Sequence, residues 1–353
     1  MPVTPPSSLP PSIAGIARDP AWLPHRYDPE HDAIHFLHIP RAVHRHATFL
    51  TDDYLPTGRA PTPVLRREAI ASAPSPAPLH FVFHSAFCCS TLVARALDIE
   101  GRSMGLKEPT IFNDIVGWRR RGGTGPDMAN VLDDALTLLA RPFAPGEAIV
   151  IKPSTVVQGI AAALLTLRPD AHALVLHAPL RTFLSSIAKK GLDGRLWVRT
   201  MLLGLLDDNL VPFGFSARDL LGQSDLQVAA IGWLAQHKLF ADMVDRFGSE
   251  RIRSLDSATL TARPGAMMAA LNDHFALRLD DAELAAAIDG PAFSRHSKTG
   301  ASFDTRDREE EHRAASSLHA DEIEKVAIWA ETVAATMNVA LTLPSPLLPE
   351  RPA

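Results

Sequence analysis

The stretch LHFVFHSAFCCSTLVARALD, residues 79–98, decides the fold, because an apolar run of strand length passes through a short loop of small residues into an amphipathic helical pattern. The first N–H groups of a helix have no partner within the helix and lie at the positive end of its dipole. This order of strand, loop and helix therefore predicts a phosphate-binding loop, to which Ser90 and Thr91 would add hydroxyl donors. The two glycines and the lysine of the nucleoside-triphosphatase loop are absent.

Further apolar runs follow, each with a helical pattern behind it. AIVIK at 148–152 precedes a helical pattern at 156–167, and HALVLH at 172–177 precedes another at 180–190. Short apolar strands that alternate with helices predict an α/β fold, a parallel sheet with helices on both faces. Ligands of such sheets lie beyond the C-terminal ends of the strands. We also expect helices over 225–247 and 320–337 and a strand over 251–255.

Composition narrows the class of protein. The 353 residues are 46% hydrophobic and 21% charged, with a net charge of −5 that excludes a basic surface for nucleic acid. No leader pattern and no apolar run of membrane-spanning length is visible, so we predict a cytoplasmic protein without a membrane partner. The two cysteines are adjacent, at 88 and 89, and cannot join distant segments, which suits a reducing compartment.

Proline content and periodicity suggest five regions. We expect a disordered Pro- and Ser-rich tail at 1–20, an N-terminal extension or small subdomain at 21–70, a linker at 71–78, the α/β domain at 79–345 and a tail at 346–353.

Three features beside the loop carry a resemblance to a known family. They are the KEP at 107–109, the IKP at 151–153, and the strand and helix pair at 172–190. Over residues 79–345 the chain resembles the sulfotransferase family, which has a P-loop-like fold, and especially its bacterial and tyrosylprotein-type branch. The resemblance implies nucleotide binding and transfer of a sulfuryl group from 3′-phosphoadenosine 5′-phosphosulfate to the hydroxyl of a small molecule or peptide, without a metal.

The resemblance assigns the cofactor-binding loop to five consecutive residues. In the family this loop surrounds the 5′-phosphosulfate and has the pattern aromatic-Pro-Arg/Lys-Ser-Gly-Thr-Thr. Here the two hydroxyl positions fall on Ser90 and Thr91, while Phe87 stands at the basic position and Cys89 at the glycine. Together with Cys88, these residues form a divergent phosphosulfate loop.

The resemblance also implies the remaining site residues. Glu108 matches the general base that follows the first helix, and Lys152 matches the lysine that contacts the transferring group. The 3′-phosphate of the family is bound by an arginine at a strand end, by a serine eight residues later and by a C-terminal Lys-Gly loop. At these places the chain has His177, Ser185 and Lys298.

Several of these residues also have a purely structural explanation. Lys152 could be an ion-paired surface group, and Glu108 could stabilise the N-terminus of the helix after it. Ser90 and Thr91 could cap their helix, and His177 could be a hydrogen-bonded histidine at the end of a buried strand.

Three functions stay open. The first is an active sulfotransferase, and the second is a protein of this fold that has lost the nucleotide and binds another phosphorylated ligand or a protein partner. An additional cation from Arg181 or Arg295 would favour the first. The third is a phosphotransfer enzyme or phosphatase that uses the loop differently. In a phosphatase, Cys89 and Arg95 would surround one phosphate, although the apolar spacing predicts a continuous helix that would carry Arg95 away.

Two other patterns allow several interpretations. His31 and His35 have the spacing of two zinc ligands on a helix, but the apolar residues around them suit a strand or a packing edge. The apolar run at 197–206 is compatible with an acceptor cleft, a homodimer face or the core.

Overall fold

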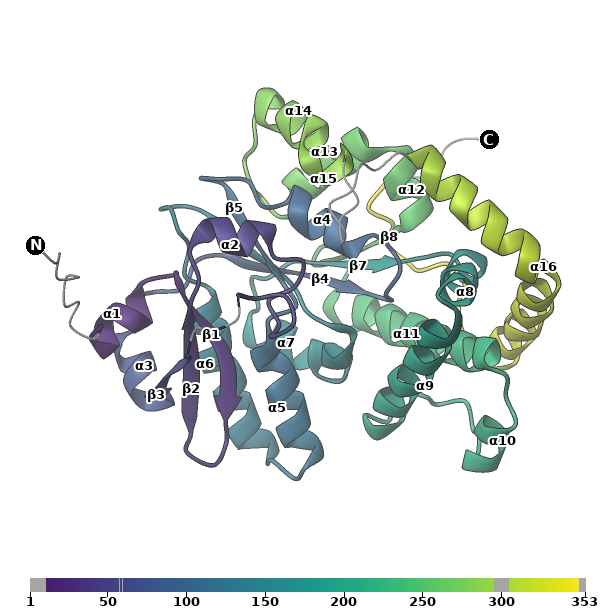
Figure 1. Ribbon diagram of the computed structural model, residues 1–353, viewed down its shortest axis with the longest axis horizontal. Coiled ribbons are helices and arrows are strands. Elements are labelled where there is room, and N and C mark those ends of the chain that lie inside the picture. The colour runs from purple at the N-terminus through teal and green to yellow at the C-terminus, as the bar shows by residue number, and fades with distance from the viewer. Residues whose placement is uncertain (1–10, 57, 59, 295–304, 349–353) are drawn as a thin grey trace, which may run out of the picture.

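The computed structural model describes residues 11–56, 58, 60–294 and 305–348 and contains two sheets (Figure 1). Five parallel strands in the order β5-β6-β4-β7-β8 form the large sheet, and three antiparallel strands in the order β1-β2-β3 form the small one. The large sheet consists of β4 (Leu79–His84), β5 (Ser103–Lys107), β6 (Ala148–Lys152), β7 (Ala173–His177) and β8 (Ile252–Asp256). The small sheet consists of β1 (Trp22–Asp28), β2 (Ala33–His38) and β3 (Thr62–Leu65).

Helices cover both faces of the large sheet, as predicted for an α/β fold. Alternate residues of β4 divide between two apolar cores, with Val82 in one and Phe81 and Phe83 in the other. The core of Val82 is built with α4 (Ser90–Ala96), α8 (Leu180–Lys189), α9 (Gly191–Asp207), α10 (Ala217–Leu221), α12 (Ser257–Ala262), α13 (Pro264–His274), α14 (Asp281–Asp289), α15 (Pro291–Ser294) and α16 (Thr305–Thr336). The opposite core is built with α5 (Thr110–Arg120), α6 (Gly125–Leu139), the 3₁₀ helix η1 (Thr155–Ile160) and α7 (Ala161–Leu167), while α11 (Asp225–Phe247) contributes to both.

The predicted elements largely coincide with the observed ones. The strand at 148–152 and the helix at 225–247 have the predicted bounds, and the strand predicted at 251–255 is found one residue later. The predicted helix at 156–167 is divided into η1 and α7, and α16 begins well before residue 320. No helix among the described residues is long and apolar enough to cross a membrane.

The N-terminal tail that we expected to be disordered contains a helix. Within the predicted tail at 1–20, α1 (Ile13–Arg18) begins at the side-chain cap of Ser12. The buried Arg141 guanidinium fixes the end of this helix, because it donates to four carbonyl oxygens there, those of Ile16, Ala17, Asp19 and Trp22. A planar group with five donors suits such a set of acceptors.

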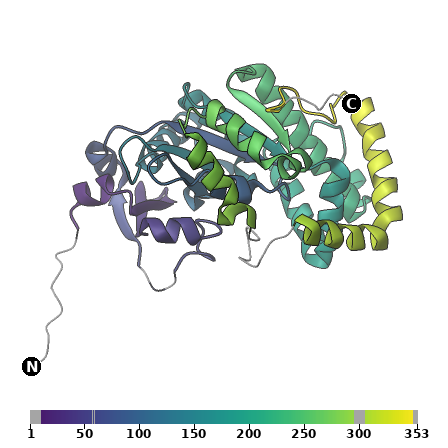
Figure 2. The same cartoon turned by 90° about the horizontal axis from the view of Figure 1, so that it is seen from above.

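The rest of the N-terminal segment, residues 19–72, packs against the edge of the large sheet. Figure 2 shows it at the end of the molecule opposite α16. Besides the small sheet it contains α2 (Arg41–His46) and α3 (Arg66–Ser72). Leu50 donates its backbone N–H to the carbonyl of Lys107 at 2.7 Å. The fully buried Lys107 ammonium donates to the carbonyls of His44 and Arg45 at 2.6 and 3.1 Å, and burial lowers the pKa of Lys107 to about 8.

Candidate functional site

The loop between β4 and α4 has an unusual backbone. Ala86, Phe87 and Cys89 have φ angles of 65°, 51° and 65°, in the left-handed region that costs a residue with a side chain about 1–2 kcal/mol. Strain of this kind persists only where the surrounding structure imposes it. The ammonium of Lys190 lies 5.9 Å from the Phe87 ring centre, so a cation that we did not predict approaches the loop from the α8–α9 junction.

Ser90 and Thr91 begin α4 but do not cap it. The N-cap is Cys89, which makes no side-chain capping bond, and both hydroxyl-bearing side chains are buried in the first turn. The capping explanation for these two residues is therefore wrong. Their role as ligand donors remains a prediction.

His84 joins this loop to the end of β6. Its Nδ1 accepts the backbone N–H of Ala86 at 3.1 Å, which leaves Nε2 to donate to the carbonyl of Pro153 at 3.0 Å. Sequence reasoning missed His84, although it is the last residue of a buried strand directly before the loop. Its ring holds the loop and the residue after Lys152 in one arrangement.

The two predicted catalytic residues meet at the ends of neighbouring strands. Glu108 donates its backbone N–H to the carbonyl of Lys152 at 2.7 Å, and its carboxylate forms a hydrogen-bonded ion pair with the Lys152 ammonium. The Lys152 side chain is 1% exposed and that of Glu108 is 19% exposed. Phe49, from the N-terminal segment, lies with its ring centre 5.0 Å from the same ammonium. Lys152 is therefore a buried, paired cation and not a solvated surface group.

The cysteines and Arg95 do not form a phosphatase site. Cys88 is fully buried, and burial raises the pKa of its thiol to about 11. The helix after Cys89 is continuous through Ala96, and Arg95 near its far end donates to the carbonyl of His46 at 3.4 Å. The phosphatase form of the third function is therefore not supported, because the thiol and the guanidinium do not surround a common point.

His177 differs from the cation that the resemblance placed there. It ends β7 in a buried position, edge-on to the ring of His237 at 4.8 Å, and Nδ1 has no hydrogen-bond partner among the described residues. Burial lowers the pKa of His177 to about 4, against the attraction of the Asp256 carboxylate. The imidazole is therefore neutral near pH 7 and offers a phosphate no charge.

The other expected anion ligands are distributed as follows. Ser185 is buried on α8, whereas Arg295 and Lys298 lie outside the described residues. Arg181 forms ion pairs with two glutamates of α16, each at 2.7 Å. Its charge is thus already compensated within the protein.

The histidine pair that suggested a metal lies on a β-hairpin and not on a helix. His31 precedes β2 and contacts Asp28 at 2.7 Å, while His35 lies within β2, with Nε2 3.9 Å from the same carboxylate. Across the part of the chain that the structure describes, no group of three or more potential metal-ligating His, Cys, Asp or Glu side chains is found.

Comparisons with known proteins give similarities among solved structures. No protein-family model matches the sequence, and no curated protein matches it significantly. The chain is similar to the sulfotransferase domain of the curacin biosynthetic pathway, with a TM-score of 0.42 and 13% identity over 76% of this chain and 99% of that one. It is also similar to the sulfotransferase domain of the Synechococcus PCC 7002 olefin synthase, with a TM-score of 0.41 and 13% identity over 76% of this chain and 97% of that one. A Mycobacterium avium sulfotransferase is similar with a TM-score of 0.42 and 15% identity over 72% of this chain and 78% of that one. The order and parallel direction of the five strands, with helices on both faces, establish the α/β fold.

Proposed function

We propose that this chain transfers a sulfuryl group from 3′-phosphoadenosine 5′-phosphosulfate to a hydroxyl acceptor. The observation that carries the proposal is the ion pair of Glu108 and Lys152 at the C-terminal ends of β5 and β6. A carboxylate that can take a proton and a cation that can stabilise transferring oxygens meet there, at the edge where parallel α/β sheets bind ligands. In this proposal the strained loop, which His84 ties to Pro153 directly after Lys152, supplies backbone donors to the phosphosulfate.

The ion pair suggests an exchange of partners during the reaction. A sulfuryl oxygen of the donor replaces the Glu108 carboxylate at the Lys152 ammonium, and the carboxylate becomes free to accept the acceptor's proton. The acceptor oxygen then bonds to sulfur while the bond from sulfur to the phosphate oxygen breaks, and the electron pair leaves with the bisphosphate nucleotide. Lys152 stabilises charge on the transferring and leaving oxygens, as positioned cations do in phosphoryl transfer.

Access to Lys152 requires a movement of Phe49. The ammonium is almost completely covered, and the Phe49 ring lies over it. A donor that reaches Lys152 displaces this ring, and its negative charge compensates for the lost cation–π contact.

A second candidate is favoured by the surroundings of His177. A 3′-phosphate there would meet a neutral imidazole, the ring of His237 and the carboxylate of Asp256. This set suits the 3′-phosphate poorly, whereas Lys152 suits the 5′ end of the donor. The alternative is a protein of this fold that binds a phosphorylated ligand without a 3′-phosphate.

Calorimetric titration with 3′-phosphoadenosine 5′-phosphate and with adenosine 5′-phosphate distinguishes these proposals. Sulfuryl transfer from this donor predicts that the bisphosphate binds more tightly than adenosine 5′-phosphate. Lys152→Met should weaken the binding of the bisphosphate about tenfold or more, since a hydrogen bond to a charged group contributes about 1.5–3 kcal/mol. Lys325→Met is the matched control, because Lys325 is exposed on α16 and pairs with Asp321. Equal affinity for both nucleotides would favour the second candidate. No binding of either would overturn sulfuryl transfer.

A further inference from the structure

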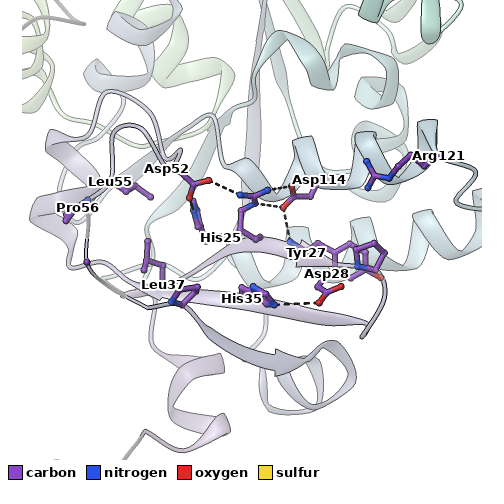
Figure 3. A pocket seen from close by; sticks show the side chains of 14 residues that line it. His25, Tyr27, Asp28, His35, Leu37, Asp52, Leu55, Pro56, Asp114 and Arg121 are labelled. Carbon is purple, nitrogen blue, oxygen red and sulfur yellow. Dashed lines mark hydrogen bonds and ion pairs between the residues drawn. The ribbon is translucent and has the colours of Figure 1, made fainter.

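A cavity of about 630 Å³, whose lining includes neither the loop after β4 nor Lys152, lies between β1, β2, α5 and the segment after Asp52 (Figure 3). Its volume falls within the range of about 300–1,000 Å³ that is usual for small-molecule sites. The proposed reaction assigns no role to it. Its lining is divided into a polar part and an apolar part, and this division indicates the kind of ligand that fits.

The polar part is organised around Arg26. Its guanidinium donates to both carboxylate oxygens of Asp114, at 2.8 and 2.9 Å, and to Asp52 at 2.8 Å. The side chains of Arg26 and Asp52 are 42% and 62% exposed, so both present polar atoms to a ligand while they hold each other in place. Asp114 Oδ2 already accepts from Arg26 and from the backbone N–H of Tyr27. Each Asp52 oxygen, in contrast, has one partner, His25 or Arg26, and keeps a lone pair for a second donor.

The apolar part faces this network from one end of the cavity. Figure 3 shows Leu37, Leu55 and Pro56 together at that end, with Asp114 and Arg121 toward the other. Leu37 and Leu55 are nearly buried, so they are fixed walls. A ligand that fills the cavity therefore needs an apolar face and a hydrogen-bonding edge.

The charges that line the cavity largely cancel. Arg26 and Arg121 contribute two positive charges, and Asp28, Asp52 and Asp114 contribute three negative ones. The sum of these side-chain charges is −1, which disfavours an anionic ligand, while Arg26 and Arg121 would repel a cationic ligand as it loses its hydration. Hydroxyl groups avoid this conflict, because one hydroxyl donates to a carboxylate and accepts from a guanidinium.

We propose that this cavity binds a neutral, polyhydroxylated molecule of sugar size. Hydroxyl groups on one edge of the ligand exchange hydrogen bonds with Asp52 and Arg26, and the C–H face of its ring packs on Leu37 and Leu55. This site is additional to the proposed sulfuryl transfer, and its occupation does not depend on that reaction.

Saturation-transfer NMR of the full chain with methyl α-D-glucopyranoside, maltose and myo-inositol tests the site, with glucose 6-phosphate and glucosamine as charged analogues. We expect signals from at least one neutral probe at millimolar concentration and weaker signals from the charged analogues. Asp52→Asn should weaken the binding about five- to tenfold, as the loss of about one hydrogen bond predicts. The matched control is Asp53→Asn, which removes the same charge from an exposed neighbour that does not line the cavity.

A second variant keeps the test valid if Asp52→Asn fails to fold. Arg121→Gln changes an exposed residue at the polar end of the cavity and should weaken the same probe in a chain with an unchanged melting temperature. No signal from any neutral probe would overturn the proposal, as would equal losses in Asp52→Asn and Asp53→Asn. Preferential binding of glucose 6-phosphate would replace it with an anion site at Arg121.

Discussion

The ammonium of Lys152 pairs with the carboxylate of Glu108, while the backbone N–H of Glu108 donates to the carbonyl of Lys152 at 2.7 Å. Because Lys152 is almost fully buried, Glu108→Gln leaves a cation without its counter-charge and should cost about 2–3 kcal/mol of unfolding free energy. Lys152→Met should cost less, since the partly exposed carboxylate can be hydrated. Urea unfolding of both single variants and the double variant gives their coupling, and strictly additive losses would contradict the pairing.

Acid should destabilise the fold before most carboxylates titrate. Burial lowers the pKa of His44 to about 3 and those of His80, His177 and His274 to about 4, whereas unfolded histidines titrate near pH 6.5. The unfolded chain therefore binds more protons below pH 6.5. Stability is fully present above that pH and falls by about 1.4 kcal/mol per pH unit for each such group until its folded pKa is reached.

Urea midpoints measured between pH 7.5 and 4.5 check this expectation. His177→Asn should flatten the decline, because it removes one of the groups. A stability that stays constant from pH 7 to pH 5 would contradict the burial of these rings as neutral groups.

Removal of the Arg141 guanidinium should release the N-terminal helix. Arg141→Met leaves the carbonyls of Ile16 and Ala17 without their buried donor and should cost about 3 kcal/mol. Hydrogen exchange in α1 should accelerate more than exchange in β4. Arg18→Met is the control, since Arg18 makes an exposed hydrogen bond to the carbonyl of Ser72 and should change stability by less than about 0.5 kcal/mol.

A side chain at position 105 should disturb the contact of α4 with β5. An added Cβ at Gly105 would lie 2.2 Å from the carbonyl oxygen of Ala94, and backbone cannot yield as a flexible side chain can. Gly105→Ala should therefore lower the melting temperature, with a loss of about 2–4 kcal/mol. Gly125→Ala, where an added Cβ meets nothing within 4 Å, should be neutral or slightly stabilising. Equal melting temperatures would contradict the close approach.

The adjacent cysteines should react differently with iodoacetamide. Cys88 is fully buried with its pKa raised to about 11, while Cys89 is partly exposed. At pH 8 the folded chain should take up one label, which mass spectrometry places on Cys89, and urea should expose the second. The folded Cys89→Ser variant keeps Cys88 as its one cysteine, so fast labelling of this variant would contradict the burial of Cys88.

The contact between Glu108 and Lys152 could be predicted from the sequence by a rule of sheet topology. Both residues end apolar or short buried segments, and parallel strands bring such ends to one edge of a sheet. The strand that leads to Glu108 was not predicted. The segment SMGLK has no apolar run, yet it is fully buried, because Gly105 allows α4 to lie directly on it.

Contacts between distant segments explain what sequence could not predict. Phe49 contacts Lys152 although the two residues are about a hundred positions apart in the sequence, and no periodicity of the sequence predicts such a contact. The neutrality of His177 depends on its burial, and the ring of His237 that packs against it comes from α11, sixty residues later. In the same way, α1 lies in a Pro- and Ser-rich region and is held by the carbonyl contacts of Arg141.

The position of β5 at the edge of the large sheet has a consequence for solubility. An edge strand with unpaired backbone groups is a template for pairing with other chains. Here the carbonyl of Ser103 accepts from Arg41 at 3.4 Å and that of Lys107 accepts from Leu50 at 2.7 Å. The N-terminal segment thus shields the strand that leads to the candidate site, and a chain shortened to begin at residue 79 would expose this edge to aggregation.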